Sequence, residues 1–242
     1  MSSVEPTSGA KMMYLIKRRP ETSREELVAH WFANHMPIVI EGQSHLQAKG
    51  KSHATRYIAS LFDADKHGAH PWDGVAQLWW DHPLPMPGTP FGTEPTDSFQ
   101  QKAEPYIPWA TREYVVLDPN LSAEPLTLNA PYPTTRSGFF KVTFLVATEP
   151  GADHTAFYQH WLVVHRPNVL EVLTAVGGTG YKISHSITPE TEQFAGMAEL
   201  YFNDESGWRR YLSTIQPDGM EQWVSDANTI VLKTQTEMVG IP

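Results

Sequence analysis

The stretch His30-Trp31-Phe32-Ala33-Asn34-His35-Met36-Pro37 recurs 130 residues later as His160-Trp161-Leu162-Val163-Val164-His165-Arg166-Pro167. The same offset aligns residues 11–39 with residues 141–169 without a gap, and both histidines, the tryptophan and the proline are identical. Self-similarity at a fixed offset is the signature of a repeated structural unit. Because tryptophan and histidine are rare, their repetition in one register predicts a duplicated domain.

A second block supports the duplication and defines the extent of each copy. Residues 73–81, DGVAQLWWD, match residues 195–203, AGMAELYFN, at an offset of 122. Residues 119–137 are rich in proline, serine, threonine and asparagine, a composition typical of linkers. We therefore expect a tail (1–10), a first copy (11–118), this linker (119–137) and a second copy (138–242).

Each copy is predicted to open with a strand followed by a helix. The strands are Met12–Arg18 and its counterpart Phe139–Ala147, and the second contains many aromatic and β-branched residues. Ser23 and Glu26 have the spacing of a capping box at the start of the first helix. A residue that precedes a proline is displaced from the helical backbone region. The helices are therefore expected to end at Met36-Pro37 and at Arg166-Pro167.

The remaining elements complete a β-α-β-β-α-β order in each copy. The expected strands are His53–Phe62, Val75–Trp80 and Arg112–Leu117 in the first copy, and Tyr181–Ile187, Met197–Phe202 and Lys233–Val239 in the second. The expected helices are Asp97–Ala103 in the first copy, and Ser206–Thr214 and Gly219–Asn228 in the second. This order is the ferredoxin-like motif, which places helices on one face of an antiparallel sheet and makes an α+β domain.

The first copy also carries a proline-rich segment where the second has a helix. Residues 82–95, HPLPMPGTPFGTEP, are too long for a tight connection. Long ordered loops often form lids or binding loops. Both a lid over a pocket and a rigid solvent-facing insertion agree with this composition.

The composition excludes several classes of protein. The chain has no cysteine, so disulfides, thiolate nucleophiles and cysteine-ligated metal centres are excluded. A net charge of −9 argues against a nucleic-acid-binding surface. The first ten residues lack the features of a signal peptide, and no apolar run has the length of a membrane span. We expect a cytoplasmic protein without nucleic-acid or membrane partners.

Two blocks of the first copy resemble the EthD-like domains of the dimeric α/β-barrel superfamily. These blocks are residues 14–39, which contain the strand, the capping box and the His-Trp…His-x-Pro pattern, and residues 73–81. The resemblance implies that the two ferredoxin-like copies pack sheet to sheet as an internal pseudo-dimer, with a further homodimer also open. The superfamily includes cofactor-free cyclases, isomerases, dehydratases, decarboxylases and monooxygenases, and relatives that use haem, so the fold does not specify the reaction.

His35 and His165 are the first candidates for chemistry. Each is predicted to end a helix and to share a face with a tryptophan, Trp31 or Trp161, one turn earlier. Histidine titrates near neutral pH, which suits a general acid or base. A purely structural role, in which the imidazole bonds a carbonyl and packs on the tryptophan, is the alternative. The preceding histidines lie five residues earlier and point elsewhere, so no metal site is expected.

Glu199 is the second candidate, because it lies within the apolar run of residues 197–202. An ionised carboxylate is costly there unless it is paired. If it faces a cavity, Glu199 can orient His165 or act as a base. If it faces the other way, it forms a salt bridge between the sheets, with Lys182 or Arg56 as candidate partners.

A set of polar and aromatic residues in the first copy is predicted to surround one substrate pocket. Arg56 suits a carboxylate or enolate oxygen, and tryptophans suit an aromatic ring. Tyr57 and Tyr181 hold similar strand positions and can donate a proton or simply pack. The remaining candidates for substrate binding are Asn34, His53, Gln77, Trp79 and Trp80, together with Trp31 and Trp161.

Three functions are compatible with these residues. The first is a cofactor-independent lyase that acts on a small apolar, aromatic or polyketide-like molecule by histidine-mediated proton transfer, through elimination or decarboxylation, with isomerisation or cyclisation as variants. The second is a cofactor-free monooxygenase acting on a phenolic substrate. The third is a non-catalytic accessory protein that binds a small molecule. No nucleotide cofactor is expected, because the chain lacks a G-x-G-x-x-G motif and a P-loop.

Overall fold

The computed structural model describes residues 4–64, 71–82, 84–121 and 132–242. The chain forms two compact units. The N-terminal unit comprises residues 8–110, 132–137 and 236–242, and the C-terminal unit comprises residues 4–7, 111–121 and 138–235. Within the described ranges, no helix combines the length and the apolar character that a membrane span requires.

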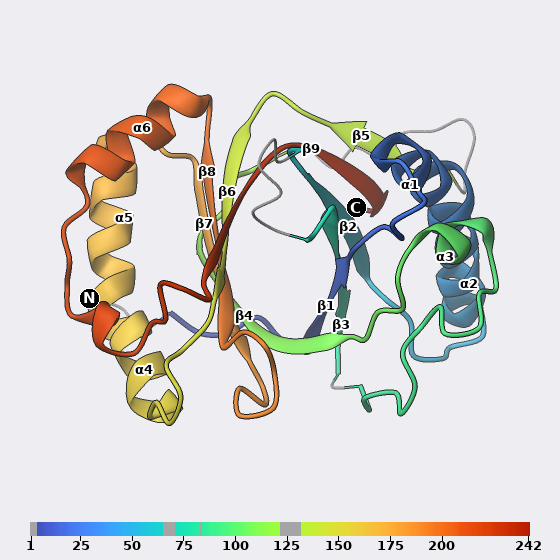
Figure 1. Ribbon diagram of the computed structural model, residues 1–242, viewed down its shortest axis with the longest axis horizontal. Coiled ribbons are helices and arrows are strands. Elements are labelled where there is room, and N and C mark those ends of the chain that lie inside the picture. The colour runs from blue at the N-terminus through green and yellow to red at the C-terminus, as the bar shows by residue number, and fades with distance from the viewer. Residues whose placement is uncertain (1–3, 65–70, 83, 122–131) are drawn as a thin grey trace. The chain divides into compact units, whose positions relative to one another are not determined.

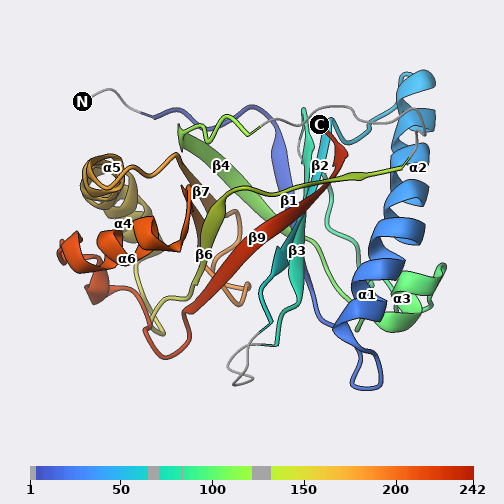
Figure 2. The same cartoon turned by 90° about the horizontal axis from the view of Figure 1, so that it is seen from above.

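The N-terminal unit is an antiparallel sheet covered on one face by helices (Figures 1 and 2). Strand β3 (Gly74–Trp80) lies between β1 (Ala10–Ile16) and β2 (Arg56–Phe62). The covering helices are α1 (Arg24–His30), the π-helical turn η1 (Trp31–His35), α2 (Met36–Ala48) and α3 (Ser98–Lys102). Strand β5 (Thr134–Arg136) pairs with the last residues of β9 (Ile230–Ile241).

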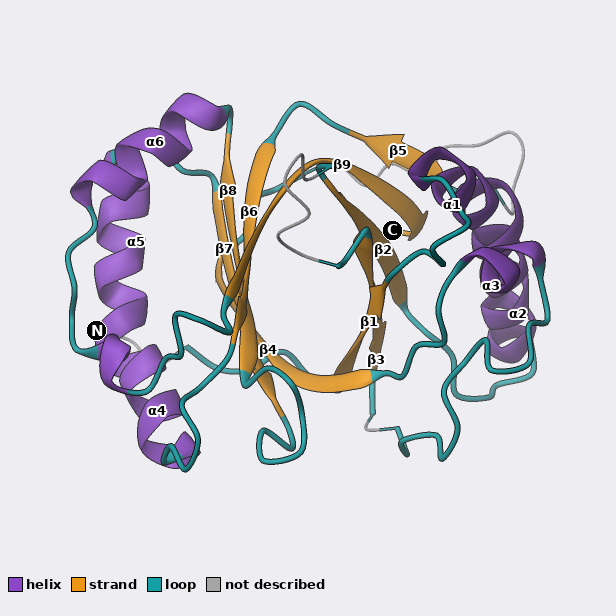
Figure 3. Ribbon diagram, in the orientation of Figure 1, coloured by secondary structure: helices purple, strands orange, loops and turns teal. Residues whose placement is uncertain are grey.

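The C-terminal unit repeats this arrangement (Figure 3). Its strands are ordered β4 (Trp109–Leu117), β7 (Gly180–Ser186), β8 (Gly196–Phe202), β6 (Phe140–Val146) and the first part of β9, with antiparallel pairing throughout. Its helices are α4 (His154–His160), the π-helical turn η2 (Trp161–His165), α5 (Arg166–Ala175), α6 (Glu205–Thr214) and the short 3₁₀ turn η3 (Met220–Gln222). The predicted α+β class and the order of elements are confirmed.

The strands agree with the predictions to within a few residues, but two helical predictions are wrong. The helix expected over residues 219–228 is only the turn η3, because Gly219 is left-handed with φ 95° and Val224 is extended in a β-bridge with Thr148. The predicted linker contains β5, and its residues 122–131 lie outside the described residues. Its boundaries, the duplication and the sheet-to-sheet packing remain predictions.

The second error concerns Pro37 and Pro167, where the helices continue instead of ending. A proline in an α-helix lacks an N–H group, and its ring clashes with the carbonyl four residues earlier. Here the turn just before the proline widens to π-helical geometry, in which the Met36 N–H bonds the Trp31 carbonyl and the Arg166 N–H bonds the Trp161 carbonyl. This wider turn accommodates the proline, so α2 and α5 follow directly.

Each widened turn starts with a tryptophan that packs against a glycine of the adjacent strand. Trp31 and Trp161 are 1% exposed and belong to the cores of their units. A β-carbon on Gly74 would lie 2.9 Å from the Trp31 ring, and one on Gly196 would lie 2.9 Å from the Trp161 ring. The same β-carbons would lie 2.6 Å from the Ser60 carbonyl oxygen and 2.8 Å from the Ser184 carbonyl oxygen, so glycine leaves room for both the indole and the neighbouring strand.

We predict that Gly74→Ala and Gly196→Ala each lower the free energy of unfolding by about 1–3 kcal/mol, because the added methyl overpacks the core. Denaturant unfolding followed by circular dichroism measures the change. Gly42→Ala is the matched control, since nothing lies within 4 Å of a β-carbon there. It lies inside α2 and should stabilise the protein by about 0.5–1 kcal/mol. Equal effects of the three substitutions would contradict the packing explanation.

His185 is a buried histidine in the core of the C-terminal unit. It stacks on Tyr158 at 4.1 Å between ring centroids. Burial, aided by the charge of Arg112, lowers the pKa of His185 from 6.5 to about 3. The matching position in the N-terminal unit is Leu61, since Leu61 pairs with Gly74 as His185 pairs with Gly196. His185 is therefore neutral in the folded protein across the physiological range.

This lowered pKa predicts a loss of stability in mild acid. The unfolded chain binds a proton at His185 below pH 6.5, whereas the folded chain does so only near pH 3, so stability falls as the pH falls between these values. From pH 6.5 to pH 5 this corresponds to about 2 kcal/mol. His185→Leu should remove that part of the pH dependence in urea unfolding measured from pH 7.5 to 4.5. An unchanged slope would show that His185 does not titrate with folding.

Candidate functional site

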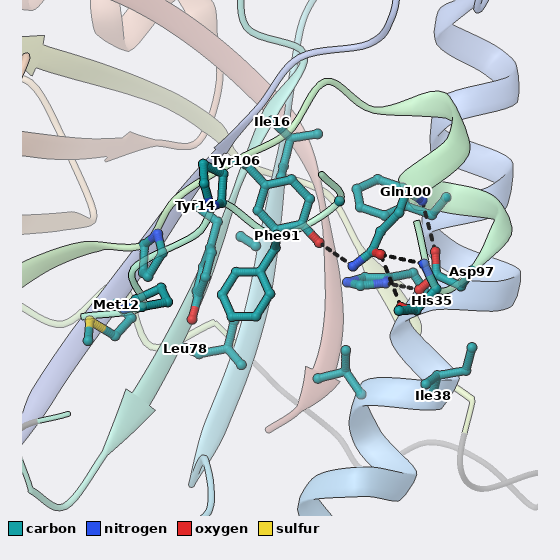
Figure 4. A pocket seen from close by; sticks show the side chains of 18 of the residues that line it. Met12, Tyr14, Ile16, His35, Ile38, Leu78, Phe91, Asp97, Gln100 and Tyr106 are labelled. Atoms are coloured by element: carbon teal, nitrogen blue, oxygen red, sulfur yellow. Dashed lines mark hydrogen bonds and ion pairs between the residues drawn. The ribbon is translucent and has the colours of Figure 1, made fainter. Parts of the chain in front are cut away.

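A pocket of about 970 Å³ lies within the N-terminal unit, and we call it the N-terminal pocket. Alternate residues of β1 and β3 line it: Met12, Tyr14, Ala76, Leu78 and Trp80. Figure 4 labels Met12, Tyr14 and Leu78 among them. Residues 84–87 and 89–94 of the proline-rich segment form another wall. The segment is therefore part of the pocket lining, and Pro83 lies outside the described residues.

Three aromatic side chains, Tyr14, Phe91 and Tyr106, form a cluster in the lining of this pocket. Tyr14 and Tyr106 meet edge to face, with ring centroids 6.1 Å apart. Phe91 lies 6.0 Å from Tyr106 and 6.1 Å from Tyr14. Edge-to-face and tilted rings at these distances attract each other through their quadrupoles. This aromatic cluster offers a flat apolar surface together with two phenol groups.

His35 is the titratable base that lines the N-terminal pocket. It is the last residue of η1, and its ring packs on Phe99 with centroids 4.5 Å apart. Its Nδ1 lies 2.6 Å from Oδ2 of Asp97. An ionised carboxylate accepts hydrogen bonds only, so Nδ1 carries the proton and donates it. Nε2 is then the nitrogen that can take up a proton when the ring carries only the one on Nδ1.

Asp97 is held in place by its own role as the N-cap of α3. Its Oδ1 accepts a hydrogen bond of 2.8 Å from the Gln100 backbone N–H. Burial acts to raise the pKa of Asp97, but the hydrogen bonds from His35 and Gln100 outweigh it and lower the pKa below the ordinary value. Asp97 is therefore ionised at neutral pH and sets the tautomer of His35.

Three tyrosine hydroxyls line the same pocket. Burial raises the pKa of Tyr106 to about 12, and it also raises the pKa of Tyr14 and Tyr57. The Trp31 indole donates to the Tyr57 hydroxyl at 3.0 Å, and Gln100 Nε2 donates to the Tyr106 hydroxyl at 3.3 Å. All three phenols are protonated at neutral pH and can donate hydrogen bonds.

A second pocket, of about 570 Å³, lies within the C-terminal unit, and we call it the C-terminal pocket. It is lined by Trp161, His165 and Tyr181 at positions that match the lining of the N-terminal pocket. His165 Nδ1 lies 2.8 Å from Oδ2 of Asp218, which also accepts a bond of 2.7 Å from Asn168 Nδ2. Both units therefore pair the last histidine of the π-helical turn with an aspartate.

The predicted role of Glu199 as a group that orients His165 is wrong. Glu199 lies on β8 between Ala198 and Leu200, which line the C-terminal pocket, so its side chain points to the opposite face of the sheet. There it forms a buried ion pair with Lys141, with Nζ and Oε1 2.8 Å apart. The carboxylate partner of His165 is Asp218, on the segment after α6.

Several residues predicted to bind substrate do not belong to the lining of the N-terminal pocket. Gln77 and Trp79 alternate with the pocket residues of β3 and face the other side of the sheet. Arg56 is exposed and lies over the Trp79 ring at 5.6 Å, while His53 bonds the Lys51 carbonyl at the surface. Asn34 accepts hydrogen bonds from the backbone and hydroxyl of Ser98, and thus ties η1 to α3.

Other predicted residues do line the two pockets. They are Trp31, His35, Tyr57 and Trp80 in the N-terminal pocket, and Trp161, His165 and Tyr181 in the C-terminal pocket. Their predicted catalytic and binding roles remain proposals, because lining a pocket does not establish a role.

The sequence analysis missed both aspartates, although a signal was present. Residues 97–101, DSFQQ, align with residues 218–222, DGMEQ, at an offset of 121, with the first and last residues identical. This weak match follows the proline-rich segment in one copy and α6 in the other, and it was hidden by their different lengths. In the part of the chain that the structure describes, no cluster of three or more histidine, aspartate or glutamate side chains is arranged to hold a metal ion.

Comparisons with known proteins agree with this fold. Residues 19–86 match the family model of the EthD domain. No curated protein matches the chain in sequence. Among solved structures, an anthrone oxidase-like protein superposes with a TM-score of 0.58 at 8% identity, over 99% of this chain and 96% of that one.

Two further structures share the fold at similar distance. A monooxygenase candidate from Fusobacterium nucleatum has a TM-score of 0.54 at 9% identity, with 99% of this chain and 96% of the other covered. A chlorite dismutase candidate has a TM-score of 0.50 at 10% identity, with 95% of each chain covered. At these identities the similarity concerns the fold and not the reaction.

The His165–Asp218 pair makes a direct prediction about titration. Burial lowers the pKa of His165 below its ordinary value, and Asp218 opposes that shift. Asp218→Asn removes the charge while keeping a hydrogen-bond acceptor, so it should lower the pKa of His165 further. Histidine C–H signals followed by NMR across pH 4–8 measure the change. Glu221→Gln is the control, because Glu221 has a weaker effect and should change the pKa less. A rise in the pKa would contradict the assigned contact.

Proposed function

We propose that this chain, an EthD-like protein of the dimeric α/β-barrel superfamily, is a lyase that eliminates a small group from an apolar, aromatic or polyketide-like molecule without a cofactor. The observation that carries the proposal is the His35–Asp97 pair, with its Nδ1–Oδ2 distance of 2.6 Å, in the lining of a largely apolar pocket. A histidine whose tautomer is set by a carboxylate is suited to take a proton and return it.

The proposed reaction starts with removal of a proton from carbon by His35 Nε2. The electron pair left on carbon forms an enolate with a neighbouring carbonyl group of the substrate. Protonated His35 then returns the proton to a hydroxyl on the adjacent carbon, the C–O bond breaks, and water leaves. Asp97 stabilises the imidazolium during this sequence, and it stays ionised because its own pKa is lowered.

The tyrosines are proposed to stabilise the enolate oxygen. Tyr14 and Tyr106 line the pocket, and burial keeps both phenols protonated. A neutral phenol donates a hydrogen bond to developing negative charge, and the bond is stronger where water is excluded. The flat rings of these residues and of Phe91 provide apolar surface for an aromatic substrate.

The charges of the pocket favour an uncharged substrate. Its described lining includes two acidic residues, Glu94 and Asp97, and neither lysine nor arginine. A carboxylate would enter this lining without a cationic partner. We therefore favour loss of water from a hydroxylated ketone over decarboxylation of a free acid.

A cofactor-free oxygenase is the second candidate. Its support is the shared fold of proteins named as an anthrone oxidase-like protein and a monooxygenase candidate. The same proton abstraction by His35 would give an electron-rich carbanion, which molecular oxygen can oxidise. This reaction consumes oxygen, whereas the elimination does not, so an oxygen electrode separates the two.

We predict that the protein accelerates the conversion of 3-hydroxy-1-tetralone to 1-naphthol and water, and that His35→Gln slows this reaction by about 10²–10⁴-fold, the usual contribution of a general acid–base group. Formation of 1-naphthol is followed by its fluorescence, with oxygen uptake and the absorbance of bound haem measured in parallel. His45→Gln, an exposed substitution on α2, is the control and should retain full activity.

Each alternative gives a different result in this experiment. Oxygen uptake in step with product would indicate the oxygenase, and a Soret band would indicate haem chemistry. Binding of the tetralone without turnover by the wild type would favour the accessory protein. Equal rates for the wild type and His35→Gln would exclude His35 as the acid–base group.

A further inference from the structure

We propose that the C-terminal pocket is a second binding site, and that its ligand is an uncharged, mostly apolar molecule with one hydroxyl group, such as a phenol. This proposal does not rest on the elimination reaction, because it concerns binding in the other unit. It rests on the walls of the pocket, on a buried hydroxyl that has no acceptor, and on the charge of the lining.

The walls of the C-terminal pocket are smaller and more apolar than those of the N-terminal pocket. Phe144 occupies the position of Tyr14, at the repeat offset of 130, so one phenol is lost. Helix α6 supplies Trp208, Tyr211 and Leu212 to a unit that lacks the proline-rich segment. Trp208 and Tyr211 stack at 5.6 Å, with an interplanar angle of 17°. These walls suit one or two fused rings.

One acceptor for a ligand hydroxyl is Nε2 of His165. The Nδ1–H group of this ring donates to Asp218, which is itself anchored by Asn168. Burial lowers the pKa of His165, which keeps the ring neutral near pH 7. The nitrogen on the other side of the ring is then a hydrogen-bond acceptor in the lining of the pocket.

The clearest sign of a missing ligand is a buried hydroxyl donor, that of Tyr181. In the N-terminal unit the Trp31 indole donates to the Tyr57 hydroxyl. In the C-terminal unit the corresponding groups, the Trp161 indole and the Tyr181 hydroxyl, are buried and interact with each other, but the proton of the Tyr181 hydroxyl has no acceptor within the described residues. Tyr181 is 1% exposed and lines the pocket. Buried polar groups without partners are rare and costly.

A single hydroxyl group on the ligand can pair with the donor on Tyr181 and with the acceptor on His165. It can accept a hydrogen bond from the Tyr181 hydroxyl and donate its own proton to His165 Nε2. A carboxylate fits poorly, because it has no proton for His165. The described lining also contains three acidic residues, Asp218, Glu221 and Asp226, and neither lysine nor arginine. The charge therefore disfavours an anion, and the hydrogen-bonding pattern selects an alcohol or a phenol.

Calorimetric titration with 2-naphthol tests the site, using a matched pair of substitutions. Ala76 and Ala198 hold equivalent positions on β3 and β8, and each lines the pocket of its own unit. Ala198→Phe should fill the C-terminal pocket and abolish its binding. Ala76→Phe should fill the N-terminal pocket and leave one molecule of 2-naphthol bound per chain. In the Ala76→Phe protein, 2-naphthoate should bind at least tenfold more weakly than 2-naphthol.

Removal of a single hydroxyl gives a second, milder test. In the Ala76→Phe protein, Tyr181→Phe should weaken the binding of 2-naphthol about threefold to tenfold, as expected for one hydrogen bond. Without ligand, Tyr181→Phe should lower the melting temperature less than Tyr57→Phe does, because the contact between Trp161 and Tyr181 is weaker than the 3.0 Å bond from Trp31 to Tyr57. Tyr57→Phe in the wild type should lower the melting temperature, because the bond from Trp31 is lost.

The proposal is overturned if Ala76→Phe abolishes all binding of 2-naphthol, or if Ala198→Phe leaves the stoichiometry unchanged. It is also overturned if 2-naphthoate binds as tightly as 2-naphthol. Should a filling substitution prevent folding, NMR of the wild type replaces it: the His165 signals, assigned with His165→Gln, should shift on addition of 2-naphthol. Failure of the tetralone reaction would leave these results unaffected, so the two proposals are tested separately.

Discussion

The widened helical turn in front of Pro37 and Pro167 is the constraint on which each unit depends. A proline at this point would ordinarily stop or kink the helix. The π-helical hydrogen bond from the residue before each proline lets the chain continue as α2 or α5. The same turn begins with the tryptophan that fills the gap above a glycine and ends with the histidine that meets an aspartate. The widened turn therefore contains both a core residue, the tryptophan, and a pocket residue, the histidine, in each unit.

The two units keep this frame and differ in what surrounds it. Each contains the His–Asp pair and a tryptophan close to a strand tyrosine. The N-terminal pocket adds Tyr14, Tyr106 and the proline-rich wall, which supply phenol donors beside a base. The C-terminal pocket substitutes Phe144 and the apolar face of α6. Such a division is physically reasonable, because the buried frame is constrained by packing, whereas the segment after β3, proline-rich in one unit and helical in the other, tolerates change.

Much of the fold could be predicted from residue patterns, and the errors have specific causes. The strands were found because their β-branched and aromatic runs reflect burial on the sheet. The helix ends were misplaced because the preference of a residue before proline is a local tendency, which a π-helical turn overrides. The error at Glu199 has another origin: alternation along β8 shows that it faces away from Leu200, but not which of the two faces carries the pocket.

The sequence by itself determined the order of elements, from the strand and helix patterns of each copy, and the histidines in question, from the repeated His-Trp…His-x-Pro pattern. These features depend on spacing along the chain, which a sequence contains directly. Only the tertiary structure decided the partners of those histidines, because Asp97 and Asp218 lie 62 and 53 residues away in the chain. It also decided which faces of the strands line a pocket. Both depend on how α3 and the segment after α6 pack against the widened turns, and packing between distant segments leaves no fixed spacing in the sequence.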